Sequence, residues 1–220
     1  MRLQGFTTGV FQANCFVVAD QEAHDAVLVD PGMEAAEPLL TAVADAGLQV
    51  RAILLTHGHV DHVMDAATVA AQLDVPCYLH PADRYLLEDP ASAIGAPSNA
   101  WQVEIPSVLR DLSDGDTIRF GERSLTARHA PGHTPGSCIF ITDGLVVSGD
   151  LIFQGSVGRT DFPKGSADAL FESIRRLVLP LDDDTIIISG HGPVTTVGDE
   201  RRSNPFLVGE RSGDLRSTGL

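Results

Sequence analysis

Four potential metal ligands stand within six residues of this chain: His57, His59, Asp61 and His62. The first three alternate along the chain, and alternate residues of an extended segment point the same way. His62 breaks that alternation and can turn to the other side as a helix begins. The apolar stretch 52–55 stands just before the ligands and is predicted as a buried strand. The ligands therefore begin where a strand ends, which is the edge at which α/β sheets build their sites.

The ligand types indicate which metals this segment suits. Neutral imidazole and carboxylate suit zinc, iron or manganese, and two adjacent metal sites could each take ligands from this one loop. Cys15, Cys77 and Cys138 are widely spaced and have apolar neighbours, so we expect buried strand residues rather than ligands or a disulfide framework. The alternative for the segment is a polar turn that caps a helix through Asp61, and its three histidines make that a poor explanation.

Charge and composition exclude several classes of function. The net charge is −15 and the pI about 4.7, which disfavours nucleic acid and anionic membranes as partners. The chain has 220 residues and is 43% hydrophobic, so we expect a single domain over 1–220 with one sizeable core. No apolar run reaches the length of a membrane span, and the N-terminus lacks the pattern of a secretory signal. The expected location is the cytoplasm.

Hydrophobic periodicity predicts an alternation of strands and helices. Strands are predicted at 6–10, 14–19, 26–30, 51–56, 75–80, 117–120, 124–130, 137–142, 145–148 and 185–189. Helices are predicted at 34–46, 63–73, 166–179 and 199–207, with a short helix starting at 81 and an irregular loop at 89–106. Strands followed by helices occur twice, which suggests two similar halves. Two sheets packed together and covered on both sides make an α/β fold, a four-layer αββα sandwich.

Three further candidate ligands follow apolar segments later in the chain. His133 lies in a Gly/Pro loop, and Asp150 and His191 each end an apolar strand in a glycine-rich turn. Each could be a turn residue by itself, but together with the first cluster they indicate one site. Asp30 also ends a strand, and it either lies near or braces the site or caps a turn. His80 is alone at a strand end and is expected to be structural.

These segments together resemble the metallo-β-lactamase superfamily, in order from Asn14 to His191. The resemblance implies two divalent metal ions, with zinc as the expected metal and iron or manganese as alternatives. It assigns three histidines to the first metal, an aspartate and two histidines to the second, and one aspartate to both: His57, His59 and His133; Asp61, His62 and His191; and Asp150.

Within this superfamily, PGHTPG at 131–136 and GRTDFP at 158–163 resemble the glyoxalase II-like (hydroxyacylglutathione hydrolase-like) and persulfide dioxygenase branch. Family members that bind glutathione firmly carry a helical C-terminal domain, and too few residues follow His191 for a separate domain of that kind. Arg159 stands where the family has a glutathione-contacting lysine, which makes it the expected substrate-binding residue. A family tyrosine two places on is Asp161 here, so the thiol carrier is left open.

The activity implied by the resemblance is hydrolysis of a thioester, the S-acyl conjugate of a small thiol, by attack of a metal-bound hydroxide. Asp61 and Asp150 are the expected catalytic residues, because each could accept the proton of the water. Arg159 could hold a carboxylate of the substrate, whereas Lys164 is expected to be a solvated surface charge.

Two alternatives from other functional classes stay open. The first is a persulfide dioxygenase that uses one iron held by His57, His133 and Asp150, an arrangement suited to O₂ chemistry. The second is a non-catalytic metal-binding protein, against which the complete set of ligands argues. The sequence assigns no oligomeric state.

Overall fold

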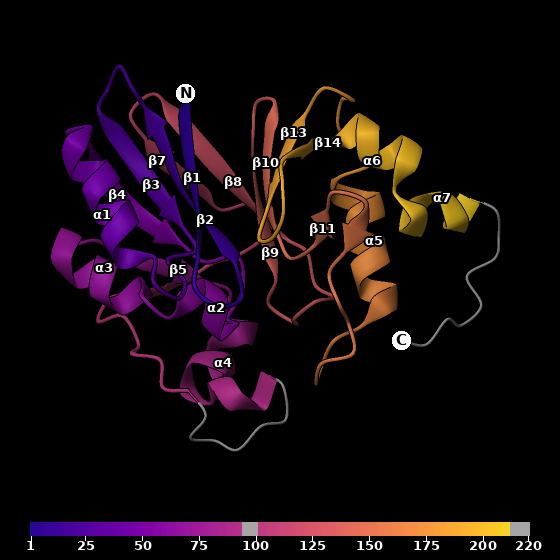
Figure 1. Ribbon diagram of the computed structural model, residues 1–220, viewed down its shortest axis with the longest axis horizontal. Helices are drawn as coiled ribbons and strands as arrows, with labels where there is room; N and C mark the ends of the chain where they lie inside the picture. The colour runs from indigo at the N-terminus through magenta and orange to yellow at the C-terminus, as the bar shows by residue number, and fades with distance from the viewer. Residues whose placement is uncertain (94–100, 212–220) are drawn as a thin grey trace.

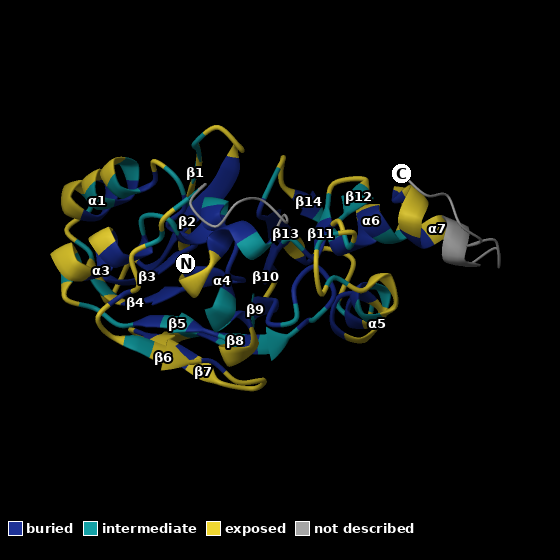
Figure 2. Cartoon of the chain, turned by 90° about the horizontal axis from the view of Figure 1, so that it is seen from below, coloured by how far each residue is buried: buried dark blue, intermediate teal, exposed yellow. Residues whose placement is uncertain are grey.

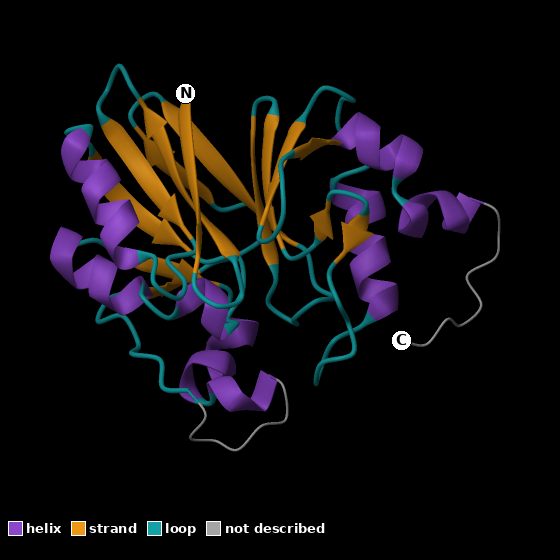
Figure 3. Ribbon diagram, in the orientation of Figure 1, coloured by secondary structure: helices purple, strands orange, loops and turns teal. Residues whose placement is uncertain are grey.

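Two β-sheets lie face to face at the centre of the structure, and helices cover the outer face of each (Figures 1 and 3). The computed structural model describes residues 1–93 and 101–211. Helices α1 (Ala36–Asp45) and α3 (Ala66–Leu73) lie on one outer side, and α5 (Ala167–Leu177) lies on the other. Among the described residues, no helix combines the length and hydropathy needed to cross a bilayer. The four-layer αββα sandwich expected from the sequence is confirmed.

The first sheet holds six strands in the order in which they occur along the chain. They are β1 (Arg2–Thr8), β2 (Ala13–Asp20), β3 (Asp25–Val29), β4 (Gln49–Leu54), β5 (Cys77–Leu79) and β6 (Leu109–Asp111). Strands β1 to β3 pair antiparallel, whereas β3 to β6 pair parallel. A parallel pair needs a crossover, which α1 supplies between β3 and β4, and which α2 (Val60–Val63) and α3 supply between β4 and β5.

The second sheet has the strand order β14-β13-β10-β9-β8-β7. Its strands are β7 (Thr117–Phe120), β8 (Arg123–His129), β9 (Cys138–Thr142), β10 (Leu145–Gly149), β13 (Ile186–Ser189) and β14 (Thr195–Thr196). Strands β10 and β13 are parallel, and α5 connects them on the outer face. A small hairpin of β11 (Ile152–Phe153) and β12 (Ser156–Val157) lies between β10 and α5 in the chain.

Both faces of the central strands are buried, which explains their nearly continuous apolar sequence. Neighbouring side chains on β2 point to opposite faces. Val17 joins the cluster under α1 and α3, whereas Phe16 joins the cluster between the sheets that also contains Phe140. A third cluster, with Leu170 and Ile174 of α5, covers the outer face of the second sheet. Figure 2 shows the resulting pattern of buried strands between helices with exposed outer sides.

Two predicted helices are each divided in the structure. The segment predicted as a helix at 199–207 is α6 (Val197–Ser203) followed by α7 (Pro205–Arg211). Asn204 between them is extended, because the residue before a proline is disfavoured in the helical region. The helix predicted at 63–73 instead begins at Val60 as α2 and starts again as α3.

The remaining differences concern short or shifted elements. Strand β1 ends at Thr8, not at residue 10, because residues 9–12 form the turn to β2. Strands β6, β11, β12 and β14 were not predicted, since two or three residues carry no readable periodicity. In the predicted loop 89–106, residues 94–100 lie outside the described residues, and 90–93 form a 3₁₀ turn, η2.

The three cysteines are buried on strands β2, β5 and β9, as predicted. Burial raises the pKa of Cys15 and of Cys77 to about 12. Burial likewise raises the pKa of Cys138. All three therefore remain neutral thiols, which are inert as nucleophiles at ordinary pH.

Replacing Phe140 by alanine should lower the free energy of unfolding by about 3–5 kcal/mol, because its ring is fully buried between the two sheets. Denaturant unfolding of the wild-type and variant proteins measures the change. Val10→Ala is the control, since Val10 is 77% exposed, and it should change stability by less than about 0.5 kcal/mol. A loss below about 1 kcal/mol for Phe140→Ala would contradict this packing.

Candidate metal centre

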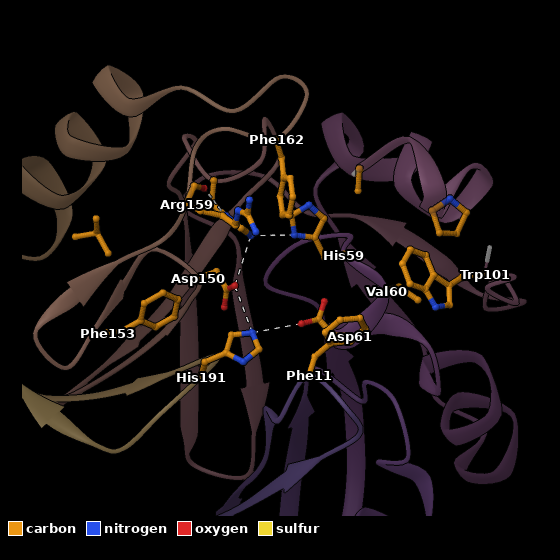
Figure 4. Close-up of a pocket in the computed structure, with 14 residues that line it drawn as sticks. Phe11, His59, Val60, Asp61, Trp101, Asp150, Phe153, Arg159, Phe162 and His191 are labelled. Atoms are coloured by element: carbon orange, nitrogen blue, oxygen red, sulfur yellow. Dashed lines mark hydrogen bonds and ion pairs between the residues drawn. The ribbon is translucent and has the colours of Figure 1, made fainter. Parts of the chain in front are cut away.

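All seven predicted ligands come from segments that follow the carboxyl ends of strands. Figure 4 shows four of them, His59, Asp61, Asp150 and His191, pointing toward one another. His57 and His59 follow β4, His133 follows β8, Asp150 follows β10 and His191 follows β13. Four segments far apart in the chain therefore meet at one edge of the sandwich, which is where α/β folds place their sites.

The local conformation of the first ligand segment differs in part from the prediction. His59 is extended, with φ −68° and ψ 145°, so it shares a direction with His57. Helix α2 begins directly afterwards at Val60, and Asp61 lies in its first turn rather than in an extended segment. The helix, and not strand alternation, therefore directs Asp61 and His62.

Three histidines form the first cluster. The Nε2 atom of His57 lies 3.1 Å from Nδ1 of His59, and the Nε2 atom of His133 lies 2.9 Å from the same Nδ1. Ligands bound tetrahedrally at about 2.0–2.1 Å from one zinc ion lie about 3.4 Å apart. The three nitrogen atoms therefore lie close to the separation that a single metal ion requires.

An aspartate and two histidines form the second cluster. Oδ2 of Asp61 lies 3.3 Å from Nε2 of His191 and 3.6 Å from Nε2 of His62. The two histidine Nε2 atoms are 3.4 Å apart. The side chain of His191 is 30% exposed whereas His62 is fully buried, so this cluster opens toward solvent on one side.

Asp150 lies between the two clusters. Its Oδ1 atom is 3.5 Å from Nε2 of His62, and its Oδ2 atom is 3.5 Å from the Nε2 atoms of His133 and of His191. Within the described part of the chain, Oδ1 of Asp150 is buried and accepts no hydrogen bond. A buried carboxylate oxygen without a donor is costly, and a cation shared by the two clusters would satisfy it.

The outward nitrogen atoms of four histidines are already engaged, which orients the rings. Nδ1 of His62 donates to Asp30, Nδ1 of His133 donates to the carbonyl of Arg159, and Nδ1 of His191 donates to the carbonyl of Gln12. Nδ1 of His57 faces the hydroxyl of Thr56 at 3.0 Å. Each contact leaves the Nε2 lone pair pointing inward, as metal-ligating histidines require.

Asp30 supports both clusters from beneath. Its Oδ1 atom accepts the backbone N–H of Thr56 at 2.7 Å, and its Oδ2 atom accepts the Thr56 hydroxyl at 2.6 Å and Nδ1 of His62 at 3.0 Å. The Thr56 hydroxyl donates to Asp30, so it accepts from His57. Of the two roles left open by the sequence, the structure therefore shows the brace.

Asp83 is a second supporting carboxylate, and no pattern in the sequence predicted this role. It is fully buried and accepts the N–H groups of Gly58 and Gly136 at 3.0 and 2.7 Å, and the hydroxyl of Thr134 at 2.6 Å. Burial raises the pKa of Asp83, and these three donors oppose that shift. Gly58 separates His57 from His59 and Thr134 follows His133, so Asp83 ties together the backbone segments that carry the first cluster.

Gly190 and Gly149 allow close approach of the chain at the site. A Cβ atom on Gly190 would lie 2.1 Å from Oδ1 of Asp150 and 2.7 Å from the His62 ring. Gly149 has φ +48°, and a Cβ atom there would lie 2.6 Å from Thr56. Any side chain at position 190 would therefore displace the carboxylate shared by the two clusters.

Electrostatics differ between the two clusters. Burial lowers the pKa of His57 and of His59 well below the usual value, and neighbouring histidines lower it further. Burial alone would also lower the pKa of His62, but Asp61 and Asp150 overcome it and raise the pKa to about 10. The first cluster therefore offers neutral nitrogen donors, and the second strongly favours positive charge at its centre.

A cavity of about 420 Å³ opens over both clusters (Figure 4). Its wall is largely apolar and includes Phe11, Pro90, Trp101, Phe153, Val157 and Phe162. Arg159 also lines the cavity, but its guanidinium is bound to Asp161 by two hydrogen bonds of 2.7 and 2.8 Å. Its predicted role in holding a substrate carboxylate stays a prediction.

Two other residues considered from the sequence lie apart from the clusters. His80 stacks on His129, with ring centroids 4.1 Å apart, and it lies in none of the metal-binding groups found in the described chain. Lys164 is exposed, as expected for a surface charge, and its ammonium also lies 3.4 Å from the centroid of the Tyr85 ring.

Comparison with known families identifies the fold and the motif together. A family model described as the metallo-beta-lactamase superfamily matches residues 8–191. The chain belongs to the metallo-beta-lactamase superfamily. Members of this superfamily bind divalent metals and are typically enzymes, and the two clusters described above have the side chains that such metals need.

Two relatives place the chain near the branch expected from the sequence. The chain is 38% identical to hydroxyacylglutathione hydrolase GloC of Haemophilus influenzae, over 94% of this chain and 98% of that protein. It is 31% identical to mitochondrial persulfide dioxygenase ETHE1 of Bos taurus, over 88% of this chain and 70% of that protein. The resemblance to the glyoxalase II-like and persulfide dioxygenase branch is confirmed.

Two solved structures are similar along their whole length. The crystal structure of BLEG-1, described as a B3 metallo-beta-lactamase, has a TM-score of 0.83 at 36% identity, covering 94% of this chain and 100% of that one. The structure of TTHA1623 in a di-iron-bound form has a TM-score of 0.79 at 42% identity, covering 93% of this chain and 100% of that one.

Replacing Asp30 by asparagine should weaken metal binding about 10–100-fold, the usual effect of losing a residue that orients a metal ligand. Every orientation of the new amide would place its NH₂ group opposite an N–H or O–H donor of Thr56 or His62. Competition against a chromophoric chelator measures the affinity of each site.

Asp114→Asn is the matched control, because the Asp114 side chain is 48% exposed and pairs with Arg128. Its metal affinity should equal that of the wild-type protein. Unchanged affinity in Asp30→Asn would contradict the bracing role.

Proposed function

We propose that this protein is a binuclear metallo-hydrolase that cleaves thioesters between an acyl group and a small thiol. The observation that carries the proposal is the position of Asp150, whose carboxylate oxygen atoms lie 3.5 Å from histidine nitrogen atoms of both clusters. A carboxylate shared in this way would hold two cations close together, as two-metal hydrolases require.

The residues divide between the two ions as the geometry suggests. His57, His59 and His133 would hold one ion, and Asp61, His62 and His191 the other, with Asp150 touching both. When bound, such a pair supplies Lewis-acid polarisation of a carbonyl and lowers the pKa of water.

The chain itself contributes proton acceptors and a largely apolar cavity wall. Asp61 and Asp150 line the cavity and can each accept the proton that the attacking water loses. A thiol has a pKa near about 8.5, so it leaves as a thiolate without a general acid. Apart from the candidate metal ligands and Arg159, the described residues that line the cavity carry no titratable side chain that could protonate an amide nitrogen, which favours a thioester over an amide.

The comparisons support the reaction class without supplying the substrate. The similarity to GloC, named as a hydroxyacylglutathione hydrolase, favours thioester hydrolysis. The similarity to ETHE1, named as a persulfide dioxygenase, keeps a second candidate in view. In that candidate one iron is held by His57, His133 and Asp150, two imidazoles and one carboxylate.

The metal content of the protein purified without added metal separates the two candidates. We expect about two divalent ions per chain, as in other two-metal sites, and release of free thiol from S-acyl thiols. One iron per chain, with oxygen uptake on a persulfide and no thioester hydrolysis, would overturn the proposal in favour of the dioxygenase. Hydrolysis of a β-lactam without thioester hydrolysis would also overturn it.

Replacing Asp150 by alanine should remove metal and activity together, because the shared carboxylate contacts both clusters. We expect fewer than two ions per chain and a loss of at least about 10³-fold in kcat/KM, the scale on which transition-state charge stabilisation is lost. Metal analysis and a thiol-release assay measure both. Near-normal turnover in Asp150→Ala would contradict the assigned role, and Asp114→Ala serves as the control.

A further inference from the structure

The cavity wall has one permanent positive charge among its described residues, and that charge is already neutralised. Arg159 binds Asp161 through two parallel contacts, Nε to Oδ1 at 2.7 Å and Nη2 to Oδ2 at 2.8 Å. Its guanidinium also lies 3.9 Å from the centroid of the Phe162 ring. This two-point contact uses the Nε and Nη2 donors of the guanidinium and places a full negative charge beside its positive charge, so a substrate carboxylate there would also face Asp161.

The position of Arg159 is fixed by its backbone as well. Its carbonyl accepts Nδ1 of His133 at 2.8 Å, so the residue is anchored to the first cluster. Asp161 is only two positions further on and shares the same loop. Arg159 therefore contributes to the cavity wall a side chain whose charge Asp161 compensates.

Aromatic rings make up much of the remaining wall. Phe162 lies edge-on to His59 with centroids 5.6 Å apart, and Phe153 lies edge-on to His191 at 6.0 Å. Phe11 and Trp101, with centroids 6.2 Å apart, line another part of the cavity. Such a wall favours uncharged groups, and the net charge of −15 repels anionic ligands at a distance.

We infer that this site selects S-acyl thiols whose thiol part carries no carboxylate, and that Asp161 sets this preference by occupying Arg159. The inference rests on the proposed thioester hydrolysis. Asp161 acts on specificity through Arg159, because its carboxylate compensates the positive charge that would otherwise attract a substrate carboxylate.

The test compares two thioesters with the same acyl group. One is built on 3-mercaptopropionamide and the other on 3-mercaptopropionate, which are nearly identical in size and differ in charge. The ratio of kcat/KM for the neutral over the anionic substrate is measured at low salt for the metal-loaded wild-type, Asp161→Asn and Asp111→Asn proteins. Asp111 forms the matching exposed pair with Arg84 away from the cavity, so Asp111→Asn removes the same charge.

We expect the wild-type protein to favour the neutral substrate about tenfold, and Asp161→Asn to lower that ratio at least about fivefold, the scale of one charge pair near a surface. The lower ratio should come from a higher kcat/KM for the anionic substrate, with kcat/KM for the neutral substrate unchanged. The effect should shrink at high salt, and it should vanish in the double variant Arg159→Gln/Asp161→Asn. Asp111→Asn should keep the wild-type ratio.

The outcomes separate the two proposals. Hydrolysis of the neutral substrate with an unchanged ratio in Asp161→Asn would overturn the inference and leave the proposed function standing. The same ratio change in Asp111→Asn would also overturn it, because net charge alone would then explain the effect. Failure of the wild-type protein to hydrolyse either thioester would overturn the proposed function itself.

Discussion

The carboxylate of Asp30 is the contact on which the geometry of the metal centre depends. It is 3% exposed, and it binds the hydroxyl of Thr56 and Nδ1 of His62 through the same oxygen atom. The Thr56 hydroxyl in turn contacts Nδ1 of His57. One buried carboxylate therefore orients a ligand of each cluster. A buried carboxylate is tolerated only where donors surround it, and Asp30 meets that condition with donors that also fix the histidine tautomers.

The sandwich supplies the rigidity that such an arrangement needs. Strands that are buried on both faces hold the start of each ligand loop in place, and their carboxyl ends meet at one edge. The loops themselves are then joined to one another by buried polar contacts, chiefly those of Asp83 with Gly58 and Thr134. Packing of the strands therefore fixes the starting point of each ligand loop, and hydrogen bonds between the loops fix the positions of the ligand atoms.

The sequence predicted those parts of the site that depend on local pattern. His57, His59, Asp61 and His62 are close in the chain and follow an apolar run, so their grouping needs no tertiary information. The double alternation of strands and helices likewise predicted the layers. Asp83 could not be predicted, because its partners lie 25, 51 and 53 residues away and nothing near it marks it as buried.

The same limit applies to the pairing of Arg159 with Asp161, which depends on the loop conformation. Arg159 has two separable functions. Its backbone carbonyl orients His133, and any residue at that position would supply the same acceptor, whereas its side chain determines the charge of the cavity wall. A loop built this way can change substrate selection while the metal ligands stay in place. That separation is consistent with relatives of one fold carrying the names of different activities, such as hydroxyacylglutathione hydrolase and persulfide dioxygenase.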